Sequence, residues 1–148
     1  MIDASLPVLK QLGVEKRVTT MVGDFFNPKT LPQKQDIYIL CQMWLNWSND
    51  DACKILNNCA EVMGSNSKLL VIDFYIPDKN HPHYKRSLLS DAALLTLVDS
   101  SNRTIPEWTN LIDRSNLRIN KIYTDDVNSS STKYEPIIPL CVIEAVVK

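Results

Sequence analysis

Two apolar runs and the amphipathic segment between them constrain the fold of this chain more than any other feature of its sequence. The runs are residues 36–41 (DIYILC) and 68–76 (KLLVIDFYI), and both are continuously apolar, as buried parallel strands are. Strand, helix and strand within roughly forty residues make a βαβ unit, whose right-handed crossover leaves the strands parallel. The sequence therefore predicts an α/β fold. The helix between the strands has one apolar stripe: Ala52, Ile55, Leu56, Cys59, Ala60 and Met63.

Polar residues predict where this helix begins and ends. Ser48 or Asn49 can cap its first turn, because either side chain can accept a hydrogen bond from a free backbone N–H. Gly64 follows the last apolar position, and we expect it to take the left-handed conformation that ends many helices.

Outside the βαβ unit, the patterns predict a further strand, two helices and a hairpin. Residues 17–26 (RVTTMVGDFF) are rich in β-formers up to Gly23, which predicts a strand ending there. Residues 117–123 alternate between apolar and polar side chains, and residues 140–147 are almost all apolar. We therefore expect an antiparallel hairpin with a long mobile loop. Its second arm should lie inside the sheet and begin at Pro139. Two apolar patterns predict the helices: Tyr84, Leu88, Leu89, Ala92, Leu95 and Val98; and, after Thr104, Trp108, Leu111 and Ile112.

Length and charge narrow the function classes. A chain of 148 residues suits one domain, and 16 basic against 17 acidic residues leave a net charge of -1. That balance argues against nucleic acid and anionic membranes as partners. Neither a secretory leader nor a membrane-spanning run is seen, so we expect a cytoplasmic protein.

The cysteines and histidines predict no metal site. Four cysteines form no CxxC pair and lie in apolar segments, which favours free structural thiols: Cys41, Cys53, Cys59 and Cys141. His81 and His83 flank Pro82 without further ligands nearby, so we interpret them as solvated loop residues.

The order of several short motifs resembles a known enzyme family. GDFF, LP, DIYIL, LNWSNDD, LLVID and RTIPEW follow one another as in the caffeate-type and acetylserotonin-type O-methyltransferases, from about Leu6 to Tyr123. The resemblance implies a class I S-adenosylmethionine-dependent enzyme with a Rossmann-like sheet, partial here, mostly parallel with a C-terminal antiparallel hairpin. Residues 1–148 would form a single partial domain. A Rossmann-like domain of another enzyme is the alternative.

The resemblance implies a position for the methyl donor. Asp24 and Phe25 match the acidic and aromatic residues that lie against the adenine of S-adenosylmethionine in this family. A carboxylate can accept from the exocyclic amine while an aromatic face stacks on the purine. Alternatively, Asp24 only caps a turn after Gly23. Asp3, or Ser5, matches the ribose-binding strand end.

The same resemblance places the catalytic positions, and one of them departs from the family. Leu45 stands where the family has the histidine that removes the hydroxyl proton, and leucine cannot act as a general base. Asp73 and Glu107 match the acidic residues that orient that histidine, although Glu107 also completes a capping box with Thr104. Trp47 is retained, with a core role favoured. The acceptor pocket would be lined by Asp91, Leu94, Leu95 and Val98.

The glycine-rich loop of the family is not found in this sequence, whose only glycines are Gly13, Gly23 and Gly64. Without the strand that precedes such a loop, the edge of the 36–41 strand is open, and open edges pair readily. We expect this edge to pair with residues 17–22 or with another polypeptide. Two functions remain as hypotheses: methyl transfer to a hydroxyl of a small, aromatic-type acceptor, or a non-catalytic methyltransferase-like module that binds a ligand or protein. A truncated gene product is a third reading.

Overall fold

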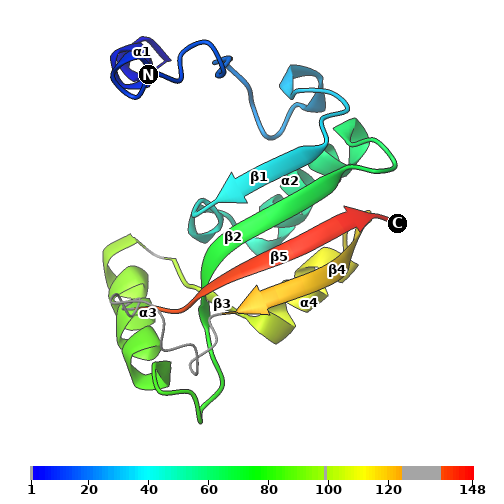
Figure 1. The fold of residues 1–148 in the computed structure, drawn as a ribbon. Coiled ribbons are helices and arrows are strands. Elements are labelled where there is room, and N and C mark those ends of the chain that lie inside the picture. Colours follow the sequence, from blue (N-terminus) through cyan, green and yellow to red (C-terminus); the bar gives the residue numbers. More distant parts are fainter. Residues whose placement is uncertain (1, 99, 125–137) are drawn as a thin grey trace.

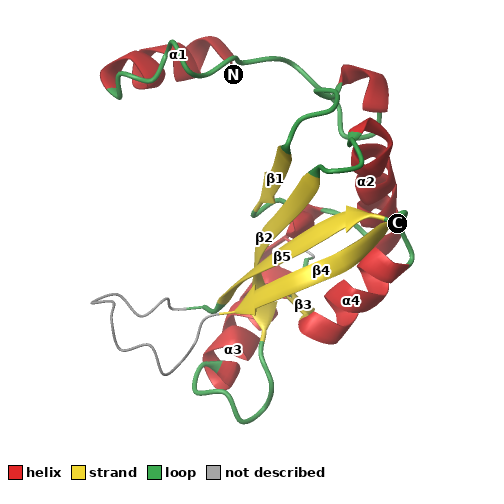
Figure 2. Ribbon diagram, turned by 45° about the vertical axis from the view of Figure 1, so that its right-hand side comes forward, coloured by secondary structure: helices red, strands yellow, loops and turns green. Residues whose placement is uncertain are grey.

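The chain forms a mixed sheet with two helices packed on one face (Figures 1 and 2). The computed structural model describes residues 2–98, 100–124 and 138–148, with side chains from residue 7 onward except that of residue 98. The four long strands lie in the order β1 (Ile37–Cys41), β2 (Lys68–Ile76), β5 (Leu140–Val147) and β4 (Leu117–Thr124). The short β3 (Arg103–Thr104) pairs with the end of β2. The predicted α/β fold is confirmed.

The described sheet has two parallel and two antiparallel strand pairs. The pairs β1–β2 and β2–β3 are parallel, as the βαβ unit predicts. The pairs β2–β5 and β5–β4 are antiparallel, which confirms the C-terminal hairpin and places its apolar second arm inside the sheet. The parallel part is therefore smaller than the expected majority, because β5 separates β2 from β4. The predicted mobile loop of this hairpin lies outside the described residues.

The core lies between the sheet and the helices α2 (Asn49–Val62) and α4 (Ile105–Asp113). All six residues of the predicted α2 stripe are buried, and the Ser48 hydroxyl accepts from the Asp51 N–H as the N-cap. Two buried indoles, Trp44 and Trp108, meet edge to face with ring centroids 5.5 Å apart. Gly64 does not take the predicted left-handed conformation, because the chain leaves α2 through an extended Met63.

The predicted strand at residues 17–26 is wrong. These residues form turns and irregular backbone, and they are exposed to solvent. A strand needs a neighbour for its hydrogen bonds, and in the described chain none lies beside this segment. They do not pair with β1 either, so that half of the pairing expectation is also wrong. The helix α1 (Ile2–Gln11), which the sequence analysis did not predict, lies apart from the sheet (Figure 1).

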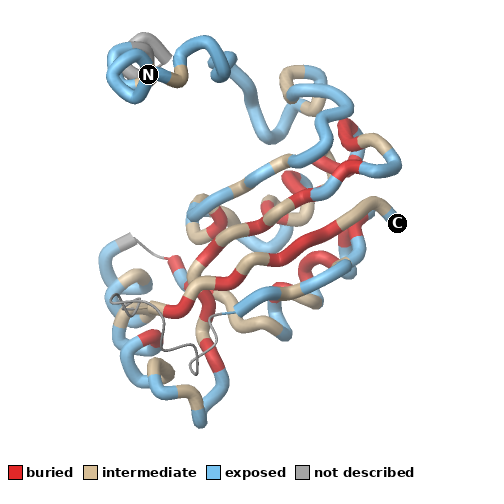
Figure 3. The backbone as a smooth tube through the Cα atoms, viewed as in Figure 1, coloured by how far each residue is buried: buried red, intermediate tan, exposed pale blue. Residues whose placement is uncertain are grey.

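Two predicted elements form but are less buried than their sequences suggest (Figure 3). On β1, Tyr38 and Leu40 pack on the core, whereas Ile37 and Ile39 are exposed, so this strand is covered on one face only. The predicted helix α3 (Tyr84–Val98) leaves most of its leucines exposed.

The four cysteines are free thiols, but they differ in burial. Cys59 and Cys141 are buried, and burial raises the pKa of the Cys59 thiol to about 11. Cys41 is exposed at the end of β1, which corrects the expectation that every thiol serves as a core residue.

Candidate functional site

The candidate site begins where β1 ends and the longer β2 continues. After Cys41, the chain turns through Gln42, whose N–H donates to the Ile72 carbonyl at 2.9 Å, and enters the short helix η2 (Trp44–Asn46). One residue further along β2 is Asp73, which thus lies beside the open end of β1. Ligands of α/β sheets bind at such carboxyl ends, which is the place predicted for Asp73.

Asp73 is a buried carboxylate that accepts a hydrogen bond from a backbone amide. It is 3% exposed, and the Phe74 N–H donates to Oδ1 at 2.9 Å. Burial raises the pKa of Asp73, while the Phe74 amide, the charge of Arg103 and the Trp44 amide oppose this rise. Asp73, carried by β2, thus lies near both Arg103 and the start of η2.

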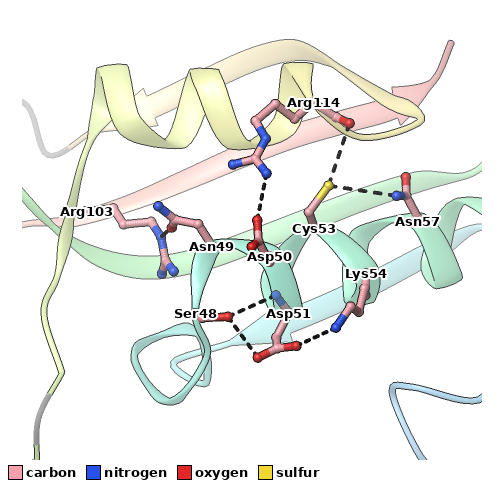
Figure 4. Close-up of polar contacts among 9 residues, drawn as sticks. All are labelled: Ser48, Asn49, Asp50, Asp51, Cys53, Lys54, Asn57, Arg103 and Arg114. Carbon is pink, nitrogen blue, oxygen red and sulfur yellow. Dashed lines mark hydrogen bonds and ion pairs between the residues drawn. The ribbon is translucent and has the colours of Figure 1, made fainter.

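Arg103 is the residue of this site that sequence reasoning missed. Its guanidinium donates to the Trp44 carbonyl at 3.2 Å and the Trp47 carbonyl at 2.9 Å, and so holds both ends of η2. Nε donates to Asn49 Oδ1 at 3.0 Å (Figure 4). The guanidinium also lies over the Trp108 ring, 5.2 Å from its centroid. Burial lowers the pKa of Arg103, while the charges of Asp73 and Glu107 oppose this decrease. Arg103 opens the RTIPEW motif, but the sequence analysis gave it no role, because the carbonyl groups that it holds lie more than fifty residues away along the chain.

Leu45 lies on the loop that Arg103 holds. It is half-buried and helps to line a cavity of about 350 Å³ together with Trp47, Ser100 and Arg103. The Ser100 hydroxyl donates to the Leu45 carbonyl, and the Ser100 N–H donates to the Leu94 carbonyl at 3.4 Å. The helix predicted to line the acceptor pocket is thus connected to the position of the missing histidine.

The turn that carries Asp24 and Phe25 is anchored near the same loop. Phe26 packs edge to face on Trp47, with ring centroids 5.1 Å apart, and Asn58 Nδ2 donates to the Phe25 carbonyl at 2.8 Å. Asp24 Oδ1 accepts from the Phe26 N–H at 2.9 Å, which is the turn-capping role considered above. The Asp24 carboxylate and the Phe25 ring are nevertheless exposed, so a ligand can reach both.

Glu107 caps α4. Its Oε2 accepts from the Thr104 N–H at 2.7 Å and hydroxyl at 2.8 Å, while the Thr104 hydroxyl accepts from the Glu107 N–H at 3.3 Å. This is the predicted capping box. A carboxylate in the first turn also interacts favourably with the positive end of the helix dipole. The contacts of Glu107 thus account for a structural role.

The proposed acceptor residues are only partly gathered at the site. Asp91 Oδ1 accepts from the buried Asn102 N–H at 2.6 Å, which ties α3 to the segment before β3. Leu94 is half-buried, whereas Leu95 is exposed. The Val98 and Asp3 side chains lie outside the described residues, and the Asp3 backbone belongs to α1 rather than to a strand end.

The histidine loop differs from its prediction. His81 is half-buried rather than solvated, its Nε2 is buried without a hydrogen-bond partner, and its Nδ1 accepts from the His83 N–H at 3.2 Å. It helps to line a cavity of about 420 Å³ with Pro77 and Ile105. Among the residues described, no three His, Cys, Asp or Glu side chains gather as a metal ion would require.

None of the described helices combines the length and apolarity needed to cross a membrane. A cytoplasmic location stays a prediction.

The chain matches proteins of one family. The O-methyltransferase domain family matches residues 2–117. O-methyltransferase 10 of Dictyostelium discoideum is 34% identical over 113 residues, which cover 71% of this chain and 26% of that protein. The solved structure of mitomycin 7-O-methyltransferase MmcR has a TM-score of 0.75 at 27% identity, covering 96% of this chain and 38% of that one.

A second solved structure shares the fold at lower identity. It is an O-methyltransferase (NcsB1) from neocarzinostatin biosynthesis, in complex with S-adenosyl-L-homocysteine and 1,4-dihydroxy-2-naphthoic acid. The TM-score is 0.73 at 24% identity, with 99% of this chain and 39% of that chain covered. The chain thus spans between 26% and 39% of the length of these three proteins. Because the family match extends over most of its residues, the chain belongs to the O-methyltransferase family.

Proposed function

We propose that this chain is part of an enzyme that transfers a methyl group from S-adenosylmethionine to a hydroxyl oxygen of a small aromatic acceptor. One observation carries the proposal: the contact between Phe26 and Trp47 holds the Asp24–Phe25 turn beside the loop that bears Leu45. The turn with the donor-binding candidates thereby lies beside the loop that carries the general-base position. Family membership supports the reaction class, as does the bound naphthoic acid and donor product of the neocarzinostatin relative.

The donor fits this chain at its adenine end. The exposed carboxylate of Asp24 can accept from the adenine amine, and the Phe25 ring, 38% exposed, offers a face for the purine. The sequence contains no glycine-rich loop that would bring backbone amides to the other end of the donor. We therefore assign only the adenine end to residues of this chain.

The hydroxyl proton needs a destination that Leu45 cannot provide. When bound, S-adenosylmethionine supplies an electrophilic methyl carbon; a bond forms from the acceptor oxygen as the carbon–sulfur bond breaks, and the hydroxyl proton leaves. Asp73 is buried and accepts from the Phe74 N–H, and the Glu107 carboxylate accepts from Thr104, so we propose that both residues position the site. The proton then passes to water, which suits a phenolic acceptor, since phenols ionise near a pKa of about 10.

The second candidate is a non-catalytic methyltransferase-like module that binds a ligand or a protein. The leucine at position 45 favours it, because the loop keeps its fold through Arg103 and Ser100 without offering a base. The two candidates differ in whether methyl transfer takes place.

Calorimetric titration with S-adenosylmethionine tests the donor site. We expect a dissociation constant on the order of micromolar, weakened by about 1–3 kcal/mol in Phe25→Ala because the stacking face is lost. Phe74→Ala, an aromatic truncation on β2, is the matched control. Absence of binding heat would contradict the donor assignment.

Turnover tests the reaction. Incubation with the donor and a panel of phenols should yield methylated product, and Leu45→His should raise the rate by roughly 10²-fold or more, the usual contribution of general-base catalysis. Donor binding without product from either protein would favour the non-catalytic module.

A further inference from the structure

The helix η2, which carries Leu45, is too short to hold its own shape. It has a single turn, and among the described residues no side chain caps its start. Its backbone hydrogen bonds are long: the Asn46 N–H lies 3.5 Å from the Met43 carbonyl. The Trp47 N–H donates to the Trp44 carbonyl at 3.2 Å. Helices this short are unstable by themselves in water, because nucleation fixes several dihedral angles for one hydrogen bond. Contacts with other parts of the chain therefore impose the conformation of η2.

Residues 100–103, the segment between α3 and α4 that leads into β3, supply those contacts. The Ser100 hydroxyl donates to the Leu45 carbonyl, and Arg103 donates to the Trp44 and Trp47 carbonyls. Ser100 is 7% exposed, so its hydrogen bond forms away from bulk water, where such bonds are electrostatically stronger. The 100–103 segment thus holds carbonyl groups before, at and after the position that the resemblance assigns to the general base.

The 100–103 segment is itself tied to α3. Asp91 Oδ1 accepts from the Asn102 N–H at 2.6 Å, and Asn102 is 8% exposed. A bond from an amide to a carboxylate is charge-assisted, and is roughly twice as strong as one between neutral groups. The Ser100 N–H donates to the Leu94 carbonyl at 3.4 Å, which joins the segment to α3 at a second point. One continuous series of hydrogen bonds thus runs from α3 through residues 100–103 to the Leu45 carbonyl.

We propose that Ser100 and Asp91 are positioning residues for position 45. Ser100 fixes the backbone of residue 45 directly, and Asp91 fixes Ser100 by holding the Asn102 amide. Asp91 then acts on the site through this amide and need not touch the acceptor. The meaning of position 45 rests on the proposed function, whereas the hydrogen bonds that carry the inference do not. Positioning matters because a misplacement of about 1 Å can lower an enzymatic rate by about 10²-fold.

Hydrogen exchange at the Trp47 amide, which closes the turn of η2, tests the arrangement without turnover. Ser100→Ala should speed this exchange roughly fivefold, the effect of losing one hydrogen bond of ordinary strength on local opening. Ser115→Ala is the matched control, because this buried serine also donates to a carbonyl, that of Ile112 at 2.7 Å, but lies outside the 100–103 segment. An unchanged rate in Ser100→Ala, or equal acceleration in both variants, would overturn the proposal.

Variants of Asp91 test whether it acts through the 100–103 segment. Asp91→Ala should speed exchange of the Trp47 amide by a similar factor. Asp91→Asn keeps an acceptor oxygen for the Asn102 N–H and should restore the wild-type rate. In the double variant with Ser100→Ala the two effects should be less than additive, because both residues belong to one series of hydrogen bonds. Full additivity, or no restoration in Asp91→Asn, would contradict the role given to Asp91.

Turnover of Leu45→His adds a second readout. In this background Ser100→Ala should lower kcat roughly tenfold and leave the KM for the acceptor unchanged, because the introduced base is misplaced while the acceptor keeps its contacts. Ser100→Thr retains the hydroxyl and should keep the rate. A higher KM at unchanged kcat would mean that Ser100 contacts the acceptor, and would refute a positioning role. Should Leu45→His show no methyl transfer, the proposed function fails, while the exchange rates still decide on Ser100 and Asp91.

Discussion

The helices α4 and α3 are predicted by the same kind of apolar spacing, yet they differ fully in burial. α4 buries Trp108, Leu111 and Ile112 against the sheet, whereas α3 leaves Leu89 74% exposed and has three further exposed leucines. α4 lies over the sheet beside α2, while α3 lies beyond the end of the strands (Figures 1 and 2). Periodicity thus predicts that a helix forms, but what it packs against depends on the strands placed beside it.

The largest test of this difference removes a buried ring from α4. Trp108→Ala should lower the free energy of unfolding by about 3–5 kcal/mol, because it leaves a cavity beside Trp44 and removes the surface under Arg103. Urea unfolding followed by circular dichroism measures this change. A loss below about 1 kcal/mol would mean that α4 does not carry the core.

The segment leading into α4 offers the next largest effect. Arg103→Met keeps an apolar stem but removes the donors to the Trp44 and Trp47 carbonyls, and should cost about 2–3 kcal/mol. Arg114→Met is the control, because the side chain of that arginine forms an exposed ion pair with Asp50, a kind typically worth about 0–1 kcal/mol (Figure 4). Equal losses in the same unfolding assay would contradict a special role for Arg103.

A smaller, pH-dependent effect is expected at Asp73. Its pKa is raised in the folded protein, mainly by burial, so above the ordinary value of 3.8 the folded state holds this proton more firmly than the unfolded state. Ionisation of Asp73 therefore lowers stability as the pH rises from 3.8 through the raised pKa. Asp73→Asn retains an acceptor for the Phe74 amide and lacks this loss. Urea midpoints across that window should fall in the wild type relative to the variant; parallel curves would refute the prediction.

The cap of α4 contributes less. Thr104→Ala removes the hydroxyl that accepts from the Glu107 N–H and should cost about 1 kcal/mol. Thr96→Ala on α3 is the matched control, since that hydroxyl donates to the Ala93 carbonyl within its own exposed helix. The midpoint temperature of thermal unfolding should fall in Thr104→Ala and stay unchanged in Thr96→Ala.

The smallest effect is expected on α3. Leu89→Ala should change the free energy of unfolding by no more than about 0.5 kcal/mol, since an exposed leucine loses few contacts. A chemical denaturation curve measures this. A cost comparable to that of Trp108→Ala would show that α3 packs on a surface and would remove the contrast between the helices.

Sequence patterns correctly predicted the elements that depend on residues close together in the chain or on a strongly apolar run. The limits of β2, the buried stripe of α2 and the capping box at Thr104 all follow from side chains a few residues apart. The predicted strand at 17–26 failed because its β-formers have no neighbouring strand in the described chain. Strand propensity is realised only where another strand supplies hydrogen bonds.

The candidate site was predictable in part. The position of Asp73 at the open end of β1 follows from where the strands end, and Leu45 follows from motif order. Arg103 and Ser100 were missed because each acts alone, on carbonyl groups more than fifty residues away along the chain. The roles of Asp24, Phe25 and Leu95 in binding stay predictions.

By itself, the sequence determined the βαβ unit, the hairpin and the family, because apolar period and motif order are properties of neighbouring residues. The tertiary structure alone decided that one face of β1 is open, that α3 is exposed and that Arg103 holds the Leu45 loop. Burial and hydrogen bonding between distant segments depend on which elements meet in space, and residue order along the chain does not specify that meeting.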